Sequence, residues 1–132
     1  METERPHILL VDDDSLMRRL FGAYLAEDGF EVIYAHNGYE GWEFARKFSP
    51  SCILLDINLP DINGLDLAAR LRNDESTKRI PVAILTSADL TQEAERALGE
   101  IGISQYIHKS ITKDEFLDRV RLLVPSSNQG RH

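Results

Sequence analysis

The chain has 132 residues and a formal net charge of −7 at pH 7, and 42% of its residues are hydrophobic and 28% charged. This length and composition predict one globular domain, and no stretch approaches the roughly 20 apolar residues of a membrane span. The acidic balance argues against nucleic-acid binding by this chain alone, and a single cysteine, Cys52, excludes an internal disulfide framework.

Five short apolar runs predict β-strands. They are rich in Ile, Leu and Val and mostly lack polar alternation, which is the pattern of strands buried on both faces of a sheet. In chain order the runs cover residues 7–11, 30–35, 52–55, 81–85 and 103–108.

Amphipathic segments between these runs predict helices. The first follows an Asp cap and carries its apolar residues at helical spacing, from Leu16 to Leu25. Glycines at positions 29 and 102 fall where C-terminal caps are expected. The later N-terminal caps are predicted at Asn37 with Glu40, at Asn63, at Asp89 with Gln92 for a helix through Leu98, and at Thr112 with Glu115.

Repeated strand–helix units predict an α/β fold with a parallel sheet, right-handed crossovers and helices on both faces. In such folds, ligands bind beyond the carboxyl ends of the strands. Four of the five runs are followed there by groups suited to metal or phosphate chemistry. These groups are Asp12, Asp13 and Asp14 after the first run, Asp56 after the third, Thr86 and Ser87 after the fourth, and Lys109 after the fifth.

The carboxylates in this set predict a cation site. Three carboxylates within about 5 Å of one another repel by roughly 3 kcal/mol per pair at an effective dielectric constant of 20, which one lysine does not neutralise. A divalent cation does, and an all-oxygen site suits Mg²⁺. Beside such a cation, Asp56 can act as a nucleophile for phosphorus, with Lys109 and Thr86 on the other phosphoryl oxygens.

Four motifs, ILLVDDD, ILLDINLPDINGL, PVAILTSAD and YIHKS, occur in this order. Through them the chain resembles the receiver domains of two-component response regulators, the CheY-like family, over residues 5 to 124. The resemblance implies a single doubly wound, flavodoxin-like (βα)5 domain with a five-stranded parallel sheet in the order 2-1-3-4-5. We assign residues 1–124 to this domain and residues 125–132 to a polar tail or the start of a linker.

The resemblance also implies roles for individual residues. Asp56 matches the phospho-acceptor. The implied metal ligands are Asp12, Asp13 as the more direct ligand, Asp56 and the backbone carbonyl of Asn58. Thr86 and Tyr106 match the switch pair, Lys109 matches the family's lysine, and Pro60 and Gly64 match the loop after the acceptor.

Two positions depart from the family or vary within it. The family usually has a proline after the lysine, often through a cis peptide bond, whereas this chain has Ser110. Because a non-proline cis bond costs roughly 2.5–4 kcal/mol, we expect this loop either to be strained or to follow a trans path. Ala88, two residues after Thr86, is small and neutral and leaves the route of hydrolytic water open.

The implied function is a phosphorylation-activated switch in bacterial two-component signalling, not a turnover enzyme. A histidine kinase or phosphotransfer protein donates the phosphoryl group in a Mg²⁺-dependent reaction. The face made by the fourth helix, fifth strand and fifth helix is then remodelled for an output partner or a homodimer. The absence of a secretory signal pattern predicts a cytoplasmic location without membrane contact.

Alternatives remain at this stage. Asp14 either joins the metal site or caps the first helix. The D-x-D pattern of Asp12 and Asp14 also occurs in haloacid-dehalogenase-type phosphatases, although that reading leaves Asp56 unexplained. A degenerate receiver that serves only as a docking module is the third alternative.

Overall fold

The computed structural model describes residues 5–125, in which strands and helices alternate along the chain. The predicted tail lies almost entirely outside these described residues. The elements are β1 (His7–Val11), α1 (Ser15–Glu27), β2 (Glu31–Ala35), α2 (Gly38–Phe48), β3 (Cys52–Asp56), α3 (Gly64–Asn73), β4 (Val82–Thr86), α4 (Gln92–Glu100), β5 (Gln105–His108) and α5 (Lys113–Leu123).

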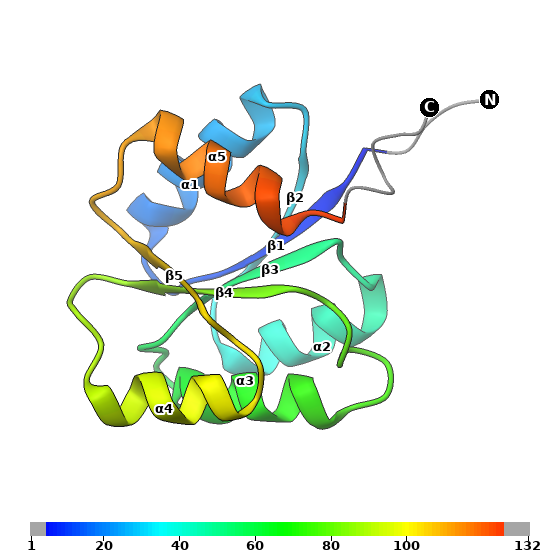
Figure 1. The fold of residues 1–132 in the computed structure, drawn as a ribbon. Helices are drawn as coiled ribbons and strands as arrows, with labels where there is room; N and C mark the ends of the chain where they lie inside the picture. Colours follow the sequence, from blue (N-terminus) through cyan, green and yellow to red (C-terminus); the bar gives the residue numbers. More distant parts are fainter. Residues whose placement is uncertain (1–4, 126–132) are drawn as a thin grey trace.

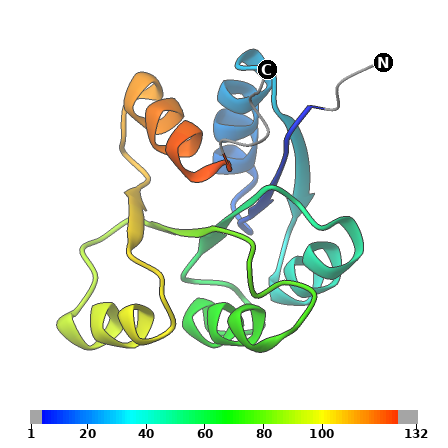
Figure 2. The same cartoon turned by 45° about the vertical axis from the view of Figure 1, so that its right-hand side comes forward.

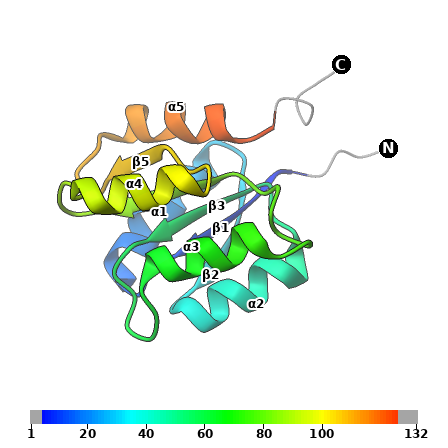
Figure 3. The same cartoon turned by 60° about the horizontal axis from the view of Figure 1, so that its bottom comes forward.

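All five strands are parallel and lie in the order β2-β1-β3-β4-β5, which confirms the predicted sheet. Helices α1 and α5 cover one face, and α2, α3 and α4 cover the other (Figures 1 and 2). Figure 3 shows these last three helices side by side across the second face. The carboxyl ends of the strands therefore meet at one edge of a three-layered domain.

Alternate residues of the central strands build two separate cores. Leu10 and Leu54 pack with Phe21 of α1 and Phe116 of α5, whose rings stack 4.5 Å apart. The neighbouring strand residues face α2, α3 and α4 instead. Because each residue points away from the face of its neighbour, a continuous apolar run supplies both cores.

The prediction that strands are buried on both faces holds for β1, β3 and β4 and is wrong for the two edges. Only Ala35 of β2 and Ile107 of β5 are buried, because an edge strand has a neighbour on one side alone. Strand ends also shift by one or two residues. In particular, Asp56 and Thr86 are the last residues of their strands, not the first residues after them.

Most helix starts follow the predicted caps. Asp14 accepts hydrogen bonds from the backbone N–H groups of Leu16 and Met17, and Asn37, Asn63 and Thr112 cap their helices as expected. The prediction for α4 is wrong, because Thr91 caps the helix in place of Asp89. Thr91 has the extended backbone of a cap, and its hydroxyl accepts from the N–H of Ala94 at 3.1 Å.

The two predicted glycine caps are confirmed. Gly29 and Gly102 have φ values of 91° and 82°, a left-handed conformation that favours glycine. None of the helices within residues 5–125 has the length and apolar character that crossing a membrane requires.

Candidate functional site

The predicted acidic residues converge at the carboxyl edge of the sheet. One carboxylate oxygen from each of Asp12, Asp13 and Asp56 lies within 4.8 Å of the others. Asp12 is fully buried and Asp56 nearly so, whereas Asp13 is exposed. Three charges that are distant in the sequence therefore share one small volume, as the parallel topology predicts.

Lys109 reaches into this cluster from the end of β5. Its Nζ lies 2.9 Å from Asp12 Oδ2 and 3.0 Å from Asp56 Oδ2. The backbone N–H of Lys109 donates to the carbonyl of Thr86 at 2.8 Å, which fixes the start of the lysine side chain. The Lys109–Ser110 peptide bond is trans, so the loop follows the second of the two expected paths. In this path the N–H of Ser110 donates to Nδ1 of His108.

Charge in the cluster is only partly balanced. Asp12 Oδ2 is fully buried, and within the described residues its polar contact is the Lys109 ammonium group 2.9 Å away, which it shares with Asp56 Oδ2. The pKa of Asp12 is raised, because burial and the charge of Asp56 raise it by more than two other interactions lower it. These two are the hydrogen bond from the backbone N–H of Asp14 and the contact with the Lys109 ammonium group. A buried carboxylate oxygen that shares one ammonium group with a second carboxylate, beside a third carboxylate, fits a hard divalent cation such as Mg²⁺.

The same surroundings also raise the pKa of Lys109. Burial alone lowers the pKa of its ammonium group, but the hydrogen bonds and charges of Asp12 and Asp56 outweigh burial and raise it. Lys109 is therefore fully charged at neutral pH. One positive charge faces three carboxylates, and the remaining negative charge favours the binding of a cation.

The loop between β3 and α3 folds back closely on Asp56. The N–H of Asn58 donates to Asp56 Oδ1 at 3.0 Å, and the N–H of Gly64 donates to the carbonyl of Ile57 at 2.9 Å. A Cβ atom on Gly64 would lie 2.6 Å from the carbonyl oxygen of Asp56 and from Ile57 Cα. Gly64 is therefore required by the close approach of two backbone segments.

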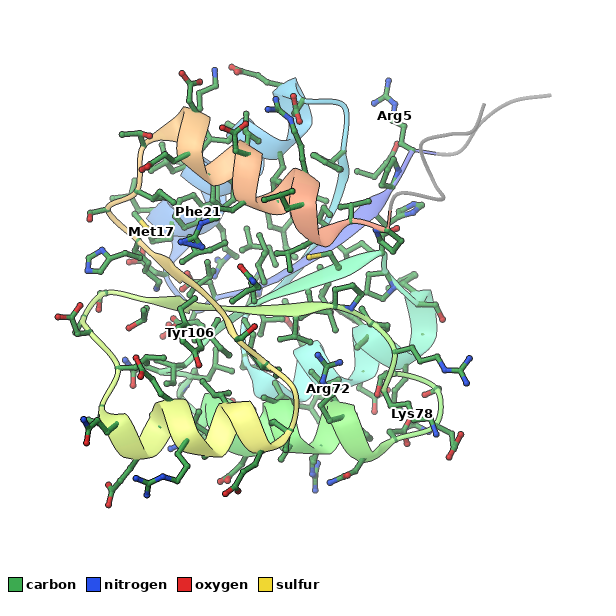
Figure 4. The ribbon with its side chains drawn as sticks, in the orientation of Figure 1. Arg5, Met17, Phe21, Arg72, Lys78 and Tyr106 are labelled. Atoms are coloured by element: carbon green, nitrogen blue, oxygen red, sulfur yellow. The ribbon has the colours of Figure 1, made fainter. Side chains whose placement is uncertain are left out.

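The predicted switch residues, Thr86 and Tyr106, line one cavity. Thr86 and Tyr106 line a hollow of about 560 Å³, together with residues of the β4–α4 loop, α4 and α5. The Thr86 hydroxyl donates to the Ala88 carbonyl at 2.5 Å and accepts from the Ala88 N–H at 3.2 Å. Tyr106 projects from β5 on the α4 side of the sheet (Figure 4), and burial together with the charge of Glu95 raises its pKa.

The structure adds two polar contacts that the sequence analysis did not predict. Arg18 of α1 donates from Nη1 to the carbonyl oxygen of Asp12 at 2.7 Å. Asp61, in the β3–α3 loop, accepts from the N–H groups of Gly38 and Tyr39 at the start of α2. The Asp61 contact spans more than 20 residues, so no local sequence pattern indicates it.

Comparisons with known proteins agree with this geometry. The family model of the response regulator receiver domain matches residues 8–121. The transcriptional regulatory protein SrrA of Staphylococcus aureus (strain NCTC 8325) is 38% identical over 118 residues, which are 89% of this chain and 47% of that protein. This chain thus spans about half the length of the curated relatives it matches.

Solved structures show the same fold. The N-terminal domain of a response regulator receiver protein from Methanoculleus marisnigri has a TM-score of 0.75 at 30% identity, covering 91% of this chain and 97% of that one. The chemotaxis protein CheY4 of Vibrio cholerae has a TM-score of 0.84 at 23% identity, covering 92% and 100% of the two chains, and supports the fold alone. On the family match and the sequence identity together, this chain belongs to the family of response regulator receiver domains.

Proposed function

We propose that this chain is a phosphorylation-activated switch in which Asp56 is the phospho-acceptor. The observation that carries the proposal is the contact of Lys109 with both Asp12 and Asp56 beside the exposed carboxylate of Asp13. This cluster combines a nucleophilic carboxylate, a fixed positive charge and a surplus of negative charge. The chain belongs to a family of regulatory domains, and this membership disfavours the phosphatase alternative.

The chemistry follows from where these groups lie. Asp12, Asp13, Asp56 and the backbone carbonyl of Asn58 would hold Mg²⁺, which when bound supplies charge neutralisation for the carboxylates and for one phosphoryl oxygen. An Asp56 oxygen attacks the phosphorus of a phosphohistidine, the O–P bond forms and the N–P bond breaks. Lys109 balances the charge of the transferred group.

The signal then passes to the cavity lined by Thr86 and Tyr106. The Thr86 hydroxyl exchanges its Ala88 partners for a phosphoryl oxygen, which moves Thr86 toward Asp56. Tyr106 follows into the space that Thr86 leaves. Both residues border α4 and α5, so the surface made by α4, β5 and α5 changes shape.

The partners follow from the same proposal. A sensor histidine kinase or phosphotransfer protein supplies the phosphoryl group in the cytoplasm. The remodelled α4-β5-α5 surface binds an output domain, a target protein or a second copy of this chain. We assign no nucleic-acid or membrane binding to this chain, whose net charge is −7.

Phosphoryl transfer to the full chain tests this function. The protein is incubated with acetyl phosphate and Mg²⁺, and its intact mass and the labelled peptide are measured. We expect one phosphoryl group on Asp56, and no label when the metal is chelated. Asp56→Asn abolishes labelling, whereas Asp118→Asn, a change at an exposed carboxylate of α5, preserves it.

Two results would contradict the proposal. A label that persists in Asp56→Asn makes the acceptor assignment wrong, and a label on Asp12 favours the phosphatase alternative. Complete absence of label in the wild type, with Mg²⁺ present, favours the degenerate docking module.

A further inference from the structure

Asp61 connects the loop after the acceptor to the start of α2. Its Oδ1 accepts from the N–H of Gly38 at 2.8 Å, and its Oδ2 accepts from the N–H of Tyr39 at 3.0 Å. The next N–H along the helix, that of Glu40, donates to Oδ1 of Asn37 at 2.8 Å. The first N–H groups of a helix have no partner within it, so α2 depends on Asp61 for two of them.

Steric contact reinforces this connection. A Cβ atom on Gly38 would lie 1.9 Å from Cγ2 of Ile62, the residue after Asp61. The loop and the helix start are therefore packed together without room for a side chain at position 38. The negative charge of Asp61 also lies at the positive end of the helix dipole.

The other end of the same loop borders the acidic cluster. The N–H of Asn58 donates to Asp56 Oδ1, and Asn58 forms an isolated antiparallel bridge with Asn63. Asp61 lies between these two bridged residues in the sequence. The position of the Asn58 backbone therefore depends on how the tip of this short loop is held.

We propose that Asp61 is a positioning residue for the metal site. By binding the start of α2, Asp61 holds the loop so that the Asn58 carbonyl faces the cation that Asp12, Asp13 and Asp56 bind. This inference rests on the proposed function, because it assumes that the cluster binds Mg²⁺. Since coupling between two sites is reciprocal, metal at the cluster also stabilises the contacts between Asp61 and α2.

Titration of the full chain with Mg²⁺ by calorimetry tests the first half of this proposal. We expect Asp61→Ala to weaken Mg²⁺ affinity by roughly three- to tenfold. This range corresponds to part of the stability that a helix cap contributes. Asp61→Asn keeps one accepting oxygen and should give an intermediate affinity. The matched control is Asn37→Ala, which loosens the same helix turn without touching the loop and should retain wild-type affinity.

Amide hydrogen exchange tests the reciprocal half. In the wild type, saturating Mg²⁺ should slow exchange at the N–H groups of Gly38 and Tyr39 by the same factor that Asp61→Ala costs in affinity. The N–H of Ala94, which Thr91 caps in α4, serves as an internal control and should show only the general stabilisation of the fold by Mg²⁺. A purely structural cap would make the Gly38 and Tyr39 amides no more sensitive to metal than that of Ala94.

The outcomes separate this inference from the function on which it rests. Wild-type affinity in Asp61→Ala, or an equal loss in Asn37→Ala, overturns the positioning role while Mg²⁺ binding and phosphorylation of Asp56 stand. A wild-type chain that binds no Mg²⁺ overturns both. Circular dichroism confirms that each variant is folded before its affinity is compared.

Discussion

At the scale of single residues, the ionised side chain of Asp12 lies in unfavourable surroundings. Its side chain is fully buried, and its Oδ2 shares the single ammonium group of Lys109 with Asp56. Two such charges within 5 Å repel by about 3 kcal/mol at an effective dielectric constant of 20. Without a cation, an ionised Asp12 therefore destabilises the folded protein.

Replacement of Asp12 by Asn should stabilise the metal-free protein. At neutral pH we expect the free energy of unfolding to rise by about 1 kcal/mol, because the neutral amide removes charge repulsion at nearly the same volume. Urea denaturation in the presence of a chelator measures this change. The control Asp118→Asn, at an exposed position, should stay within about 0.5 kcal/mol of the wild type.

The pH dependence gives the sign of this effect. The pKa of Asp12 is raised above 3.8 in the folded protein, so the folded state binds this proton more tightly than the unfolded state does. Stability is therefore lost as the pH rises from below 3.8 through the raised pKa. The advantage of Asp12→Asn should be complete above that raised pKa and should disappear below pH 3.8. An advantage that persists in acid would contradict this explanation.

At the scale of elements, the start of α4 determines which residues border the cavity that Thr86 and Tyr106 line. Thr91 caps the helix through the N–H of Ala94, although Asp89 with Gln92 has the spacing of a capping box. Both Asp89 and Leu90 instead lie in the β4–α4 loop that lines the cavity. The helix that follows Thr86 is therefore capped at Thr91.

Paired substitutions test this assignment. Thr91→Ala should lower the free energy of unfolding by about 0.5–2 kcal/mol, because it leaves a first-turn N–H without its partner. Asp89→Ala should change it by less than about 0.5 kcal/mol, as expected for an exposed loop residue. Chemical denaturation of both variants measures the difference, and a larger loss in Asp89→Ala would restore the sequence-based cap.

This example shows how far the sequence predicts individual elements. Caps at Asp14, Asn37, Asn63 and Thr112 follow from local spacing because each side chain binds an N–H two or three residues away. Near α4, two overlapping cap patterns compete, and local spacing does not choose between them. Asp61 is beyond such reasoning altogether, because its partners on α2 depend on the tertiary fold.

At the scale of the whole molecule, parallel topology brings the site together. Asp12, Asp56, Thr86 and Lys109 come from four strands whose carboxyl ends share one edge, so alternation of strands and helices was enough to predict that they meet. The strand order came from the family resemblance. The burial of β2 and β5 was predicted incorrectly because it was taken from their apolar runs alone, and such runs do not distinguish an edge strand from a central one.

At the same edge of the sheet, the charged cluster lies near the residues that border α4 and α5. The acidic cluster lies between β1 and β3, and Lys109 extends to it from beyond β5. Thr86 and Tyr106 lie on β4 and β5, the two strands that follow Asp56 in the sheet order. In our account, Mg²⁺ neutralises part of the charge of the cluster, and the phosphoryl group that is then added to Asp56 moves Thr86 and Tyr106.

The most direct test of this account is the free energy of unfolding measured across a series of Mg²⁺ concentrations. Above the dissociation constant we predict a rise of about 1.4 kcal/mol for each tenfold increase in Mg²⁺, because the cation binds only the folded cluster. Asp13→Asn and Asp56→Asn should flatten this dependence. A wild-type free energy of unfolding that does not change with Mg²⁺ would contradict the claim that Asp12, Asp13 and Asp56 form a cation-binding site.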